Sequence, residues 1–258
     1  MVLTLSKPLG SPAWLSIGSE DPEVSAEFYS AVFGWNVKRS ERHGQWGVFG
    51  RGGRSVAGIH YRNRRSGHLS WTVYFHASEE VLERARPHLT SAGNSEGVDA
   101  ASWVDTLGAR FALAAPNEGL TLGLVNESFS LYWVELFSSA PDESVRFYSS
   151  LLQWRMVETL IPGSSEKYFI ISPLSASPDA AHGGILHLDF LREAAESTSH
   201  WLPYFAVPDC EETLKKAKDS GAAVRVDVTD VEGIGREAQL IDPLGIPFGI
   251  IQPIPSRS

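Results

Sequence analysis

A repeat at constant spacing is the feature that most constrains the fold of this chain. Five residues of the first half, Trp14, Pro22, Phe28, Tyr29 and Trp35, return 119 residues later as Trp133, Pro141, Phe147, Tyr148 and Trp154. Apolar and turn-forming positions that keep one register over such a distance indicate a duplicated fold. We therefore expect tandem copies of one unit, with the function located where the copies meet or where they differ.

Each half of the sequence divides again into two similar units. An aromatic strand followed by an amphipathic helix is predicted at residues 71–75 and 79–92, and again at 201–205 and 211–221. Both halves then close on the pattern Asp-x-x-Gly-x-x-Phe, at residues 105–111 and 242–248, which suits a tight turn before a strand. The recurring order of one strand, one helix and three strands predicts an α+β fold of four tandem βαβββ units.

The composition excludes several classes of partner. The 258 residues include 22 basic and 31 acidic side chains, and the formal charge of −9 repels phosphate backbones and anionic lipids. No segment approaches the ~20 apolar residues of a membrane span, and the first residues lack an apolar secretion signal. We expect a cytoplasmic protein without a nucleic-acid or membrane partner. Cys210, the only cysteine, excludes an internal disulfide, and its acidic neighbours are expected to raise the thiol pKa.

Four such units resemble a known superfamily. The markers are Asp21-Pro22-Glu23, Phe33-Gly34-Trp35, Val56-Ala57-Gly58 and Asp242-Pro243-Leu244-Gly245. With these markers the chain is similar, over residues 12–253, to the glyoxalase, bleomycin-resistance and extradiol-dioxygenase group, the vicinal oxygen chelate superfamily. In that group paired units form curled, half-open mixed sheets around a cleft, so the resemblance implies two such domains. We place the first domain at residues 1–120, the linker at 121–130 and the second domain at 131–258.

The resemblance also implies where metal-dependent members place His, Glu or Gln. Those positions are occupied by Trp14, Thr72 and Ala112 in the first half and by Trp133, Leu202 and Gly249 in the second. Only His60 stands where a ligand is expected. Because a catalytic divalent cation generally needs three protein ligands, we expect no metal and no other cofactor. An unusual metal site built from His182, His187 and Asp189 is the alternative.

Two candidate catalytic residues follow from strand alternation. If Trp14 and Trp133 point into the clefts, a period of two directs Ser16 and Glu135 into the same clefts. A carboxylate that is partly desolvated beside Trp133 has a raised pKa, which suits a general base or acid. Glu135 is therefore the first candidate, and His60 is its candidate partner acid. The structural alternative is that Glu135 forms an ion pair and His60 bonds to a backbone carbonyl.

The expected ligand is a bulky apolar molecule. The candidate binding residues are Trp14, Ser16, Thr72, Tyr74, Trp133, Leu202, Tyr204 and Gly249. Large flat side chains at the mouth of a cleft suit an aromatic or hydrophobic small molecule. Tyr74 and Tyr204 could donate hydroxyl groups to such a guest, although their repetition in both halves favours a packing role.

Three functions remain open at the level of sequence. The first is a metal-independent enzyme that tailors a polyketide-like natural product by dehydration, cyclisation or isomerisation, as in relatives that have lost their metal positions. The second is a non-catalytic antibiotic-sequestering or carrier protein of the bleomycin-resistance type, whose acidic surface would favour a cationic guest. The third is a metal-dependent glyoxalase or dioxygenase with other ligands. Tandem duplication supplies unit pairing internally, so either a monomer or a homodimer is compatible.

Overall fold

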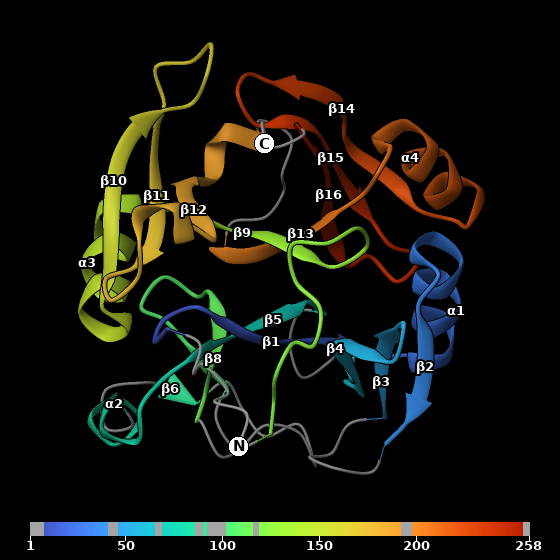
Figure 1. The fold of residues 1–258 in the computed structure, drawn as a ribbon, viewed down its shortest axis with the longest axis horizontal. Helices are drawn as coiled ribbons and strands as arrows, with labels where there is room; N and C mark the ends of the chain where they lie inside the picture. Colours follow the sequence, from blue (N-terminus) through green and yellow to red (C-terminus); the bar gives the residue numbers. More distant parts are fainter. Residues whose placement is uncertain are drawn as a thin grey trace.

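The computed structural model describes residues 8–40, 46–64, 69–85, 90–91, 102–115, 119–191 and 198–254. Within these residues one order of elements occurs four times (Figure 1). The first unit consists of β1 (Pro12–Ser19), α1 (Pro22–Phe33), β2 (Asn36–Arg39), β3 (Gly47–Arg51) and β4 (Arg54–Tyr61). The second consists of β5 (Trp71–His76), α2 (Glu79–Ala85), β6 (Thr90–Ser91), β7 (Ser102–Val104) and β8 (Arg110–Ala114).

The second half repeats the same elements. The third unit consists of β9 (Leu131–Ser138), α3 (Pro141–Leu152), β10 (Trp154–Leu160), β11 (Lys167–Pro173) and β12 (Gly183–His187). The fourth consists of β13 (His200–Ala206), α4 (Cys210–Asp219), β14 (Ala223–Val231), β15 (Gly235–Ile241) and β16 (Pro247–Pro253). Short 3-10 helices η4 (Pro178–Ala180) and η5 (Leu188–Leu191) flank β12. The predicted α+β fold of four βαβββ units is confirmed.

Each pair of units shares one mixed sheet. Among the described residues, the N-terminal sheet has eight strands in the order β2-β3-β4-β1-β5-β8-β7-β6. The C-terminal sheet has the corresponding order β10-β11-β12-β9-β13-β16-β15-β14. The first strands of two units pair antiparallel at the centre of each sheet, β1 with β5 and β9 with β13. Neither order returns to its starting strand, so both sheets stay open.

The helix that opens the first half, α1, begins and ends on local sequence signals. Asp21 accepts hydrogen bonds from the backbone N–H groups of Glu23 and Val24, and Pro22 occupies the first turn of α1. Gly34, at φ 67°, ends the helix in the left-handed conformation. Phe28 and Tyr29 on the buried side of α1 then enter the core.

Two predicted boundaries were wrong. The helix expected over residues 79–92 ends at Ala85, and Thr90–Ser91 form strand β6. The residues between these two elements, 86–89, lie outside the described part. The alternating run at residues 184–190 also predicts a strand over its whole length, but the strand ends at His187 and the 3-10 helix η5 follows it.

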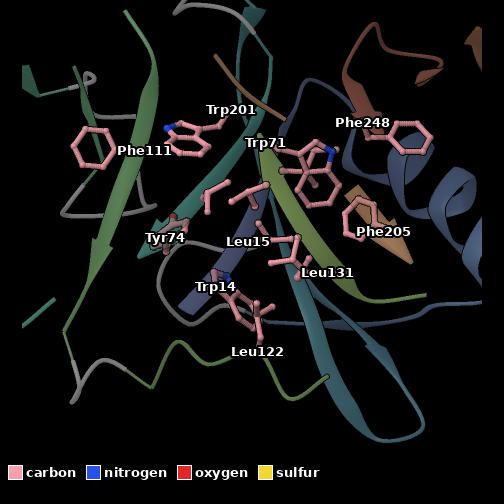
Figure 2. Close-up of a cluster of buried hydrophobic side chains, with 14 of the residues drawn as sticks. Trp14, Leu15, Trp71, Tyr74, Phe111, Leu122, Leu131, Trp201, Phe205 and Phe248 are labelled. Atoms are coloured by element: carbon pink, nitrogen blue, oxygen red, sulfur yellow. The ribbon is translucent and has the colours of Figure 1, made fainter. Parts of the chain in front are cut away.

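The main hydrophobic core joins the two sheets. Trp71 of β5 and Phe205 of β13 have ring centroids 5.4 Å apart, and Phe75 of β5 lies 5.2 Å from Trp201 of β13. Figure 2 shows these indoles and Phe248 together between strands of different halves. In Figure 1 the sheets face each other, with α1 beside α4 at one side and α2 beside α3 at the other. The two halves therefore bury their aromatic side chains against each other.

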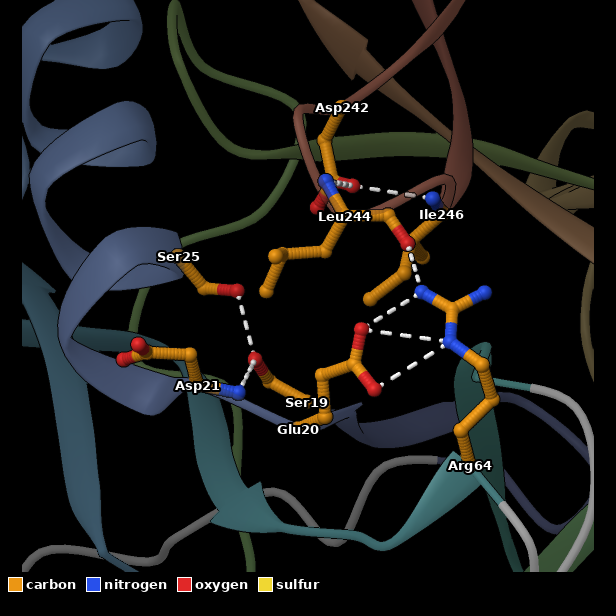
Figure 3. Close-up of polar contacts among 8 residues, drawn as sticks. All are labelled: Ser19, Glu20, Asp21, Ser25, Arg64, Asp242, Leu244 and Ile246. Carbon is orange, nitrogen blue, oxygen red and sulfur yellow. Dashed lines mark hydrogen bonds and ion pairs between the residues drawn. The ribbon is translucent and has the colours of Figure 1, made fainter.

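Polar contacts also connect the halves, and they use the repeated residues. The Tyr29 hydroxyl donates to Asp242 Oδ2 at 3.2 Å, and the equivalent Tyr148 hydroxyl donates to Asp105 Oδ2 at 2.9 Å. Each Asp also closes its own turn; Asp242 Oδ1 accepts the backbone N–H groups of Leu244 and Ile246 (Figure 3). These repeated residues thus connect helix α1 to a turn of the second half, and helix α3 to a turn of the first half.

Two further expectations concern membrane-spanning segments and the single cysteine. Across the described ranges, no helix combines the length and the apolar content that a membrane crossing requires. Cys210 is buried at the start of α4, and its thiol donates to the carbonyl of Arg236. Burial is the main reason that the Cys210 pKa is raised to about 11, which confirms the predicted direction. The thiol is protonated and buried, so it is unsuited to act as a nucleophile.

Candidate functional site

Each sheet turns one face toward the shared core and its outer face away from it. Along β9, Val134 and Leu136 belong to the shared core, whereas Trp133 packs with a separate apolar cluster on the outer face. Strand alternation places Glu135 on that same outer face. The same alternation puts Ser16 on the outer face of the N-terminal sheet. The candidate residues of the two halves therefore lie on different sheets.

Glu135 is the centre of a hydrogen-bonded cluster on the C-terminal sheet. The hydroxyl of Tyr168, on β11, donates to Glu135 Oε1 at 2.8 Å. The hydroxyl of Tyr204, on the neighbouring strand β13, donates to Glu135 Oε2 at 2.7 Å. Both carboxylate oxygens are therefore held by phenols from the two sides of β9, an arrangement that fixes the carboxylate in one orientation.

The cluster extends by one donor beyond each tyrosine. Trp133 Nε1 donates to the Tyr168 hydroxyl at 2.8 Å, and Gln239 Nε2 donates to the Tyr204 hydroxyl at 2.8 Å. Each phenol receives one hydrogen bond and passes one on to Glu135. Because every donor points toward the carboxylate, the network suits Glu135 in its ionised form. We call these five residues the Glu135 cluster.

Two glycines make room for the tyrosine rings. A Cβ atom on Gly249 would overlap the ring of Tyr204, and a Cβ atom on Gly184 would overlap the ring of Tyr168. Gly249 pairs with Tyr204 in the sheet, and Gly184 pairs with Glu135. The rings can thus lie over bare backbone while their hydroxyls reach Glu135. Gly249 acts through this close approach, since it has no side chain to offer a ligand.

The carboxyl groups of Glu135 and Glu237 differ in their protonation state. Burial raises the pKa of Glu135, and the hydrogen bonds from Tyr204 and Tyr168 oppose that shift. Burial, followed by the charge of Glu135, raises the pKa of Glu237 to about 8. Because Glu135 has two phenolic donors, we assign the ionised state to Glu135 and the protonated state to Glu237 at neutral pH. A base and an acid thus share one face of the sheet.

The N-terminal sheet carries a different group of candidate residues. Ser16 Oγ and His60 Nδ1 are hydrogen-bonded at 2.9 Å, and Thr72 is the pairing partner of Ser16 on β5. His60 is only 3% exposed, and burial is the main reason that its pKa is lowered to about 4; Arg62 and Arg110 contribute. At neutral pH His60 is therefore a neutral imidazole.

The structure brings some of the predicted site residues together and separates others. Glu135, Trp133 and Tyr204 lie in one cluster, with Leu202 buried at the strand position that pairs with Glu135. His60 lies on the other sheet, so it does not partner Glu135. Trp14 and Tyr74 are 4% and 1% exposed, and Figure 2 shows Trp14 beside Leu122. Their rings are packed within the protein, so they offer a ligand little surface.

Comparisons with known proteins agree with this architecture. No protein-family model matches the chain. The Mycobacterium bovis protein named "Putative glyoxylase CFP32" is 26% identical over 261 residues, 96% of this chain and 97% of that protein. The anthracycline biosynthesis protein DnrV of Streptomyces peucetius is 26% identical over 269 residues, 94% and 93% of the two chains. The 2,3-dioxygenase LapB from Pseudomonas sp. KL28 superposes with a TM-score of 0.60 at 13% identity, covering 98% and 96%.

The chain has the vicinal oxygen chelate fold. The residues at the metal positions of that fold do not fit a divalent cation here. On the C-terminal sheet, Leu202 has no donor atom and Gly249 lies against the ring of Tyr204. Among the described residues, no group of three or more His, Cys, Asp or Glu side chains could hold a metal ion.

The alternative metal site does not assemble either. His182 packs between the sheets, with its ring centroid 5.6 Å from Trp154, and burial lowers its pKa to about 4. His187 and Asp189 face solvent and contact each other, with Nδ1 and Oδ2 at 3.6 Å. His182 and His187 thus have separate environments, and they do not form a metal site with Asp189.

Several residues of the site were not singled out in the sequence. Tyr168, Glu237 and Gln239 belong to runs that had no marker of function, and neither Arg62 nor Arg110 belongs to a motif that indicates a function. The polar residues Glu237 and Gln239, two apart on β15, were the available signal, because alternation places both on one face. Sequence alone did not show that this face lies next to Glu135.

A surface groove elsewhere lacks the features of a binding site. Its volume is about 460 Å³, and its lining residues are Glu211, Leu214, Lys215, Lys218, Asp219, Asp227 and Val228. They belong to α4 and β14, outside the outer faces that carry Glu135 and His60. Mixed charges at the surface provide few apolar contacts for a bulky ligand.

Proposed function

We propose that the outer face of the C-terminal sheet binds a bulky aromatic small molecule of the polyketide type and transforms it by acid-base chemistry without a metal. The observation that carries this proposal is the fixed carboxylate of Glu135, held by Tyr168 and Tyr204 on a face that it shares with Glu237. A protein does not gain stability from two partly buried carboxyl groups on one face of a sheet, so their presence indicates a use.

An apolar cluster beside Glu135 supports a hydrophobic ligand. Its buried members are Phe137, Leu186, Leu188, Leu202, Tyr204 and Ile251. Trp133 and Ile161 are only partly buried against it, and Ile161 comes from the turn between β10 and β11. A planar ligand would stack on the indole and displace this turn, which then covers the site.

In the proposed chemistry each carboxyl group carries out one proton transfer. Glu135 accepts a proton from an acidic carbon–hydrogen bond beside a ketone of the ligand, and the electron pair moves onto the ketone oxygen. Glu237 donates its proton to that oxygen, so an enol forms without a net change of charge in the site. Enolisation of this kind is the first step of isomerisation, dehydration or ring closure.

The curated relatives support the ligand class. DnrV and the protein DauV of Streptomyces sp. strain C5 are both named anthracycline biosynthesis proteins, and each is 26% identical to this chain over more than nine-tenths of its length. An anthracycline is a planar polycyclic polyketide, which matches the stacking surface that Trp133 provides. The inference about the ligand rests on these names together with the apolar cluster.

A non-catalytic carrier or antibiotic-sequestering protein is the second candidate. One observation favours this candidate: two phenolic donors stabilise the ionised form of Glu135, which makes Glu135 a weaker base. An ionised carboxylate beside an indole would suit a cationic guest. This candidate and the enzyme differ in whether Glu135 is needed for conversion or for affinity.

A substitution at Glu135 separates the two candidates. Planar polyketide ketones are first screened by thermal shift, since a ligand that binds only the folded protein raises its melting temperature. With a ligand found, Glu135→Gln should retain the shift and lose conversion, measured by mass spectrometry, by about 10²-fold or more. Glu158→Gln is the matched control, because Glu158 lies on β10 of the same sheet and pairs with Lys167 at the surface. If the wild type converts no ligand and Glu135→Gln loses affinity, the result supports the carrier.

Elemental analysis tests the absence of a metal. The purified full chain should contain less than about a tenth of an equivalent of zinc, iron, manganese or nickel, because the residues that the structure describes offer too few ligands for one ion. One equivalent of any of these metals, removable by a chelator together with activity, would contradict the metal-independent proposal.

A further inference from the structure

The outer face of the N-terminal sheet differs in charge from its C-terminal counterpart. Strand pairing aligns the two sheets, because Ser16 pairs with Gly58 and Thr72 as Glu135 pairs with Gly184 and Leu202. In this alignment Ser16, His60, Arg62, Thr72 and Arg110 correspond to Glu135, Leu186, Leu188, Leu202 and Pro247. One copy thus carries a carboxylate among leucines, and the other carries two arginines, an imidazole and hydroxyls.

Arg62 is the unusual member of the N-terminal group. Its residue is only 5% exposed, and its Nε atom is shielded from solvent without a hydrogen-bond partner. Burial alone lowers its pKa, and within the described part of the chain no carboxylate pairs with it. By contrast, the exposed arginines Arg39, Arg54, Arg64 and Arg236 each pair with a glutamate. A buried guanidinium without a counter-ion is destabilising by several kcal/mol in general.

A second arginine lies close to Arg62. The Arg110 guanidinium contacts Ser102, with Nη1 and Oγ at 3.4 Å, and Arg110 neighbours Thr72 across the β5–β8 pairing. Burial, followed by the positive charge of Arg62, lowers the pKa of Arg110 to about 10. The positive charge of Arg62 thus opposes that of Arg110, in a chain whose formal charge is −9. An anion between them would remove both the repulsion and the cost of desolvation.

The backbone leaves space for these groups. A Cβ atom on Gly18 would lie 2.8 Å from Arg62 Cδ and 3.0 Å from His60 Nε2, so both side chains lie over this glycine. The corresponding residue in the C-terminal sheet is Phe137, which fills the space and stacks on His200. Gly18 therefore permits a polar group on one sheet at the place where the other sheet has an aromatic ring.

We propose that the outer face of the N-terminal sheet is an oxyanion site that binds the carboxylate or phosphate group of a small molecule through Arg62 and Arg110. Planar guanidinium groups match the two oxygens of such a group with paired hydrogen bonds. The uncharged imidazole of His60 and the Thr72 hydroxyl add directional donors without adding charge. The site goes beyond the function proposed for Glu135, because it uses other residues on the other sheet.

Ligand-dependent stability of the full chain tests this site. The melting temperature is measured at pH 7.5 and constant ionic strength, adjusted with chloride, while inorganic phosphate or benzoate is added. One or both probes should raise it saturably by about 5 °C at concentrations far above Kd, and the stronger probe identifies the preferred anion. In Arg62→Met the rise should vanish and Kd from calorimetry should weaken at least about tenfold. Without anion, Arg62→Met should melt at the wild-type temperature or higher, because an unpaired buried charge is removed.

Three further variants make the test specific. Arg110→Met should also lose the rise, which covers the case in which Arg62→Met does not fold. Arg54→Met removes an exposed arginine that pairs with Glu127, and it should respond like the wild type. Glu135→Gln should keep the full anion response, so failure of the proposed acid-base function leaves this result unchanged. The site is refuted if neither probe gives a saturable rise, or if Arg62→Met and Arg110→Met respond like the wild type.

Discussion

The chemistry of Glu135 depends on its neighbours more than on its own position. Alternation along β9 directs it to the outer face, but Tyr168 and Tyr204 decide how it is held. Glu237, from a strand three places away in the sheet, decides which of the two carboxyl groups carries a proton. The paired phenols fix the orientation of the Glu135 carboxylate, and the second carboxyl group provides an acid on the same face for proton transfer.

Glu237 should make the stability of the protein depend on pH. Its pKa is raised from 4.5 to about 8 in the folded state, so the folded protein keeps a proton that the unfolded chain releases above pH 4.5. The free energy of unfolding should therefore fall as pH rises from about 4.5 to about 8 and level off above that. Glu237→Gln should reduce this fall, which urea unfolding at pH 5, 6.5 and 8 measures. Glu158→Gln, at an exposed position, should keep the wild-type slope, and an equal slope in Glu237→Gln would contradict the assignment.

At the scale of single elements, strand pairing explains why certain glycines occupy the sheet. Gly184 and Gly249 lie on strands β12 and β16 at places where the outer face would carry a side chain. Each gives its space to a tyrosine ring from another strand. These glycines therefore act on the site through packing, and the first half has Ala112 where the second has Gly249.

A methyl group at Gly249 should disrupt the Glu135 cluster without unfolding the sheet. In Gly249→Ala the new Cβ overlaps the Tyr204 ring, so the hydroxyl moves away from Glu135. We expect a loss of about 1–3 kcal/mol in stability, typical of overpacking, and a larger loss of conversion or ligand affinity. Urea unfolding and ligand titration measure the two effects. Ala112→Gly, at the equivalent place in the other sheet, should leave ligand affinity unchanged. If Gly249→Ala leaves both conversion and ligand affinity unchanged, the position of the Tyr204 hydroxyl is not required for the site.

Element boundaries were predictable only where a local signal determined them. The start of α1 followed from Asp21 and Pro22, and its end followed from Gly34, because caps act on the adjacent backbone. The end of β12 at His187 has no such signal, since its sequence continues with apolar residues into η5. The apolar pattern that indicates a helix over residues 79–92 fails at Thr90 and Ser91, because these residues pair with strand β7 instead.

At the scale of the whole molecule, the duplication joins two halves that share one core. Tyr29 and Tyr148 each reach an aspartate in the other half, and aromatic rings from β5 and β13 pack together. The repeated residues therefore report the contact between halves, whereas the residues that differ between copies define two chemically distinct outer faces. One face carries Glu135 and the other carries Arg62.

Removing either hydroxyl that joins the halves should lower stability. Tyr29→Phe leaves Asp242 Oδ2 without its phenolic donor, which costs about 1–2 kcal/mol. Tyr148→Phe should cost more, because Trp201 Nε1 also donates to the Tyr148 hydroxyl at 3.1 Å and would lose its acceptor. Urea unfolding measures both. The double variant should show the sum of the two effects, since the sites are separate; a negligible loss in both single variants would contradict a stabilising role for these bonds.

The sequence by itself determined the four βαβββ units and the N-terminal cap of α1, and it predicted that Glu135 and Trp133 share one face of their strand. These features depend on local periodicity or on a repeat, and both can be read along the chain. The tertiary structure decided the partners: Glu135 with Tyr168 and Tyr204, and His60 with Ser16 on the other sheet. Pairing between strands far apart in sequence brings these side chains together, and no local pattern encodes which strands become neighbours or how deeply a charge is buried.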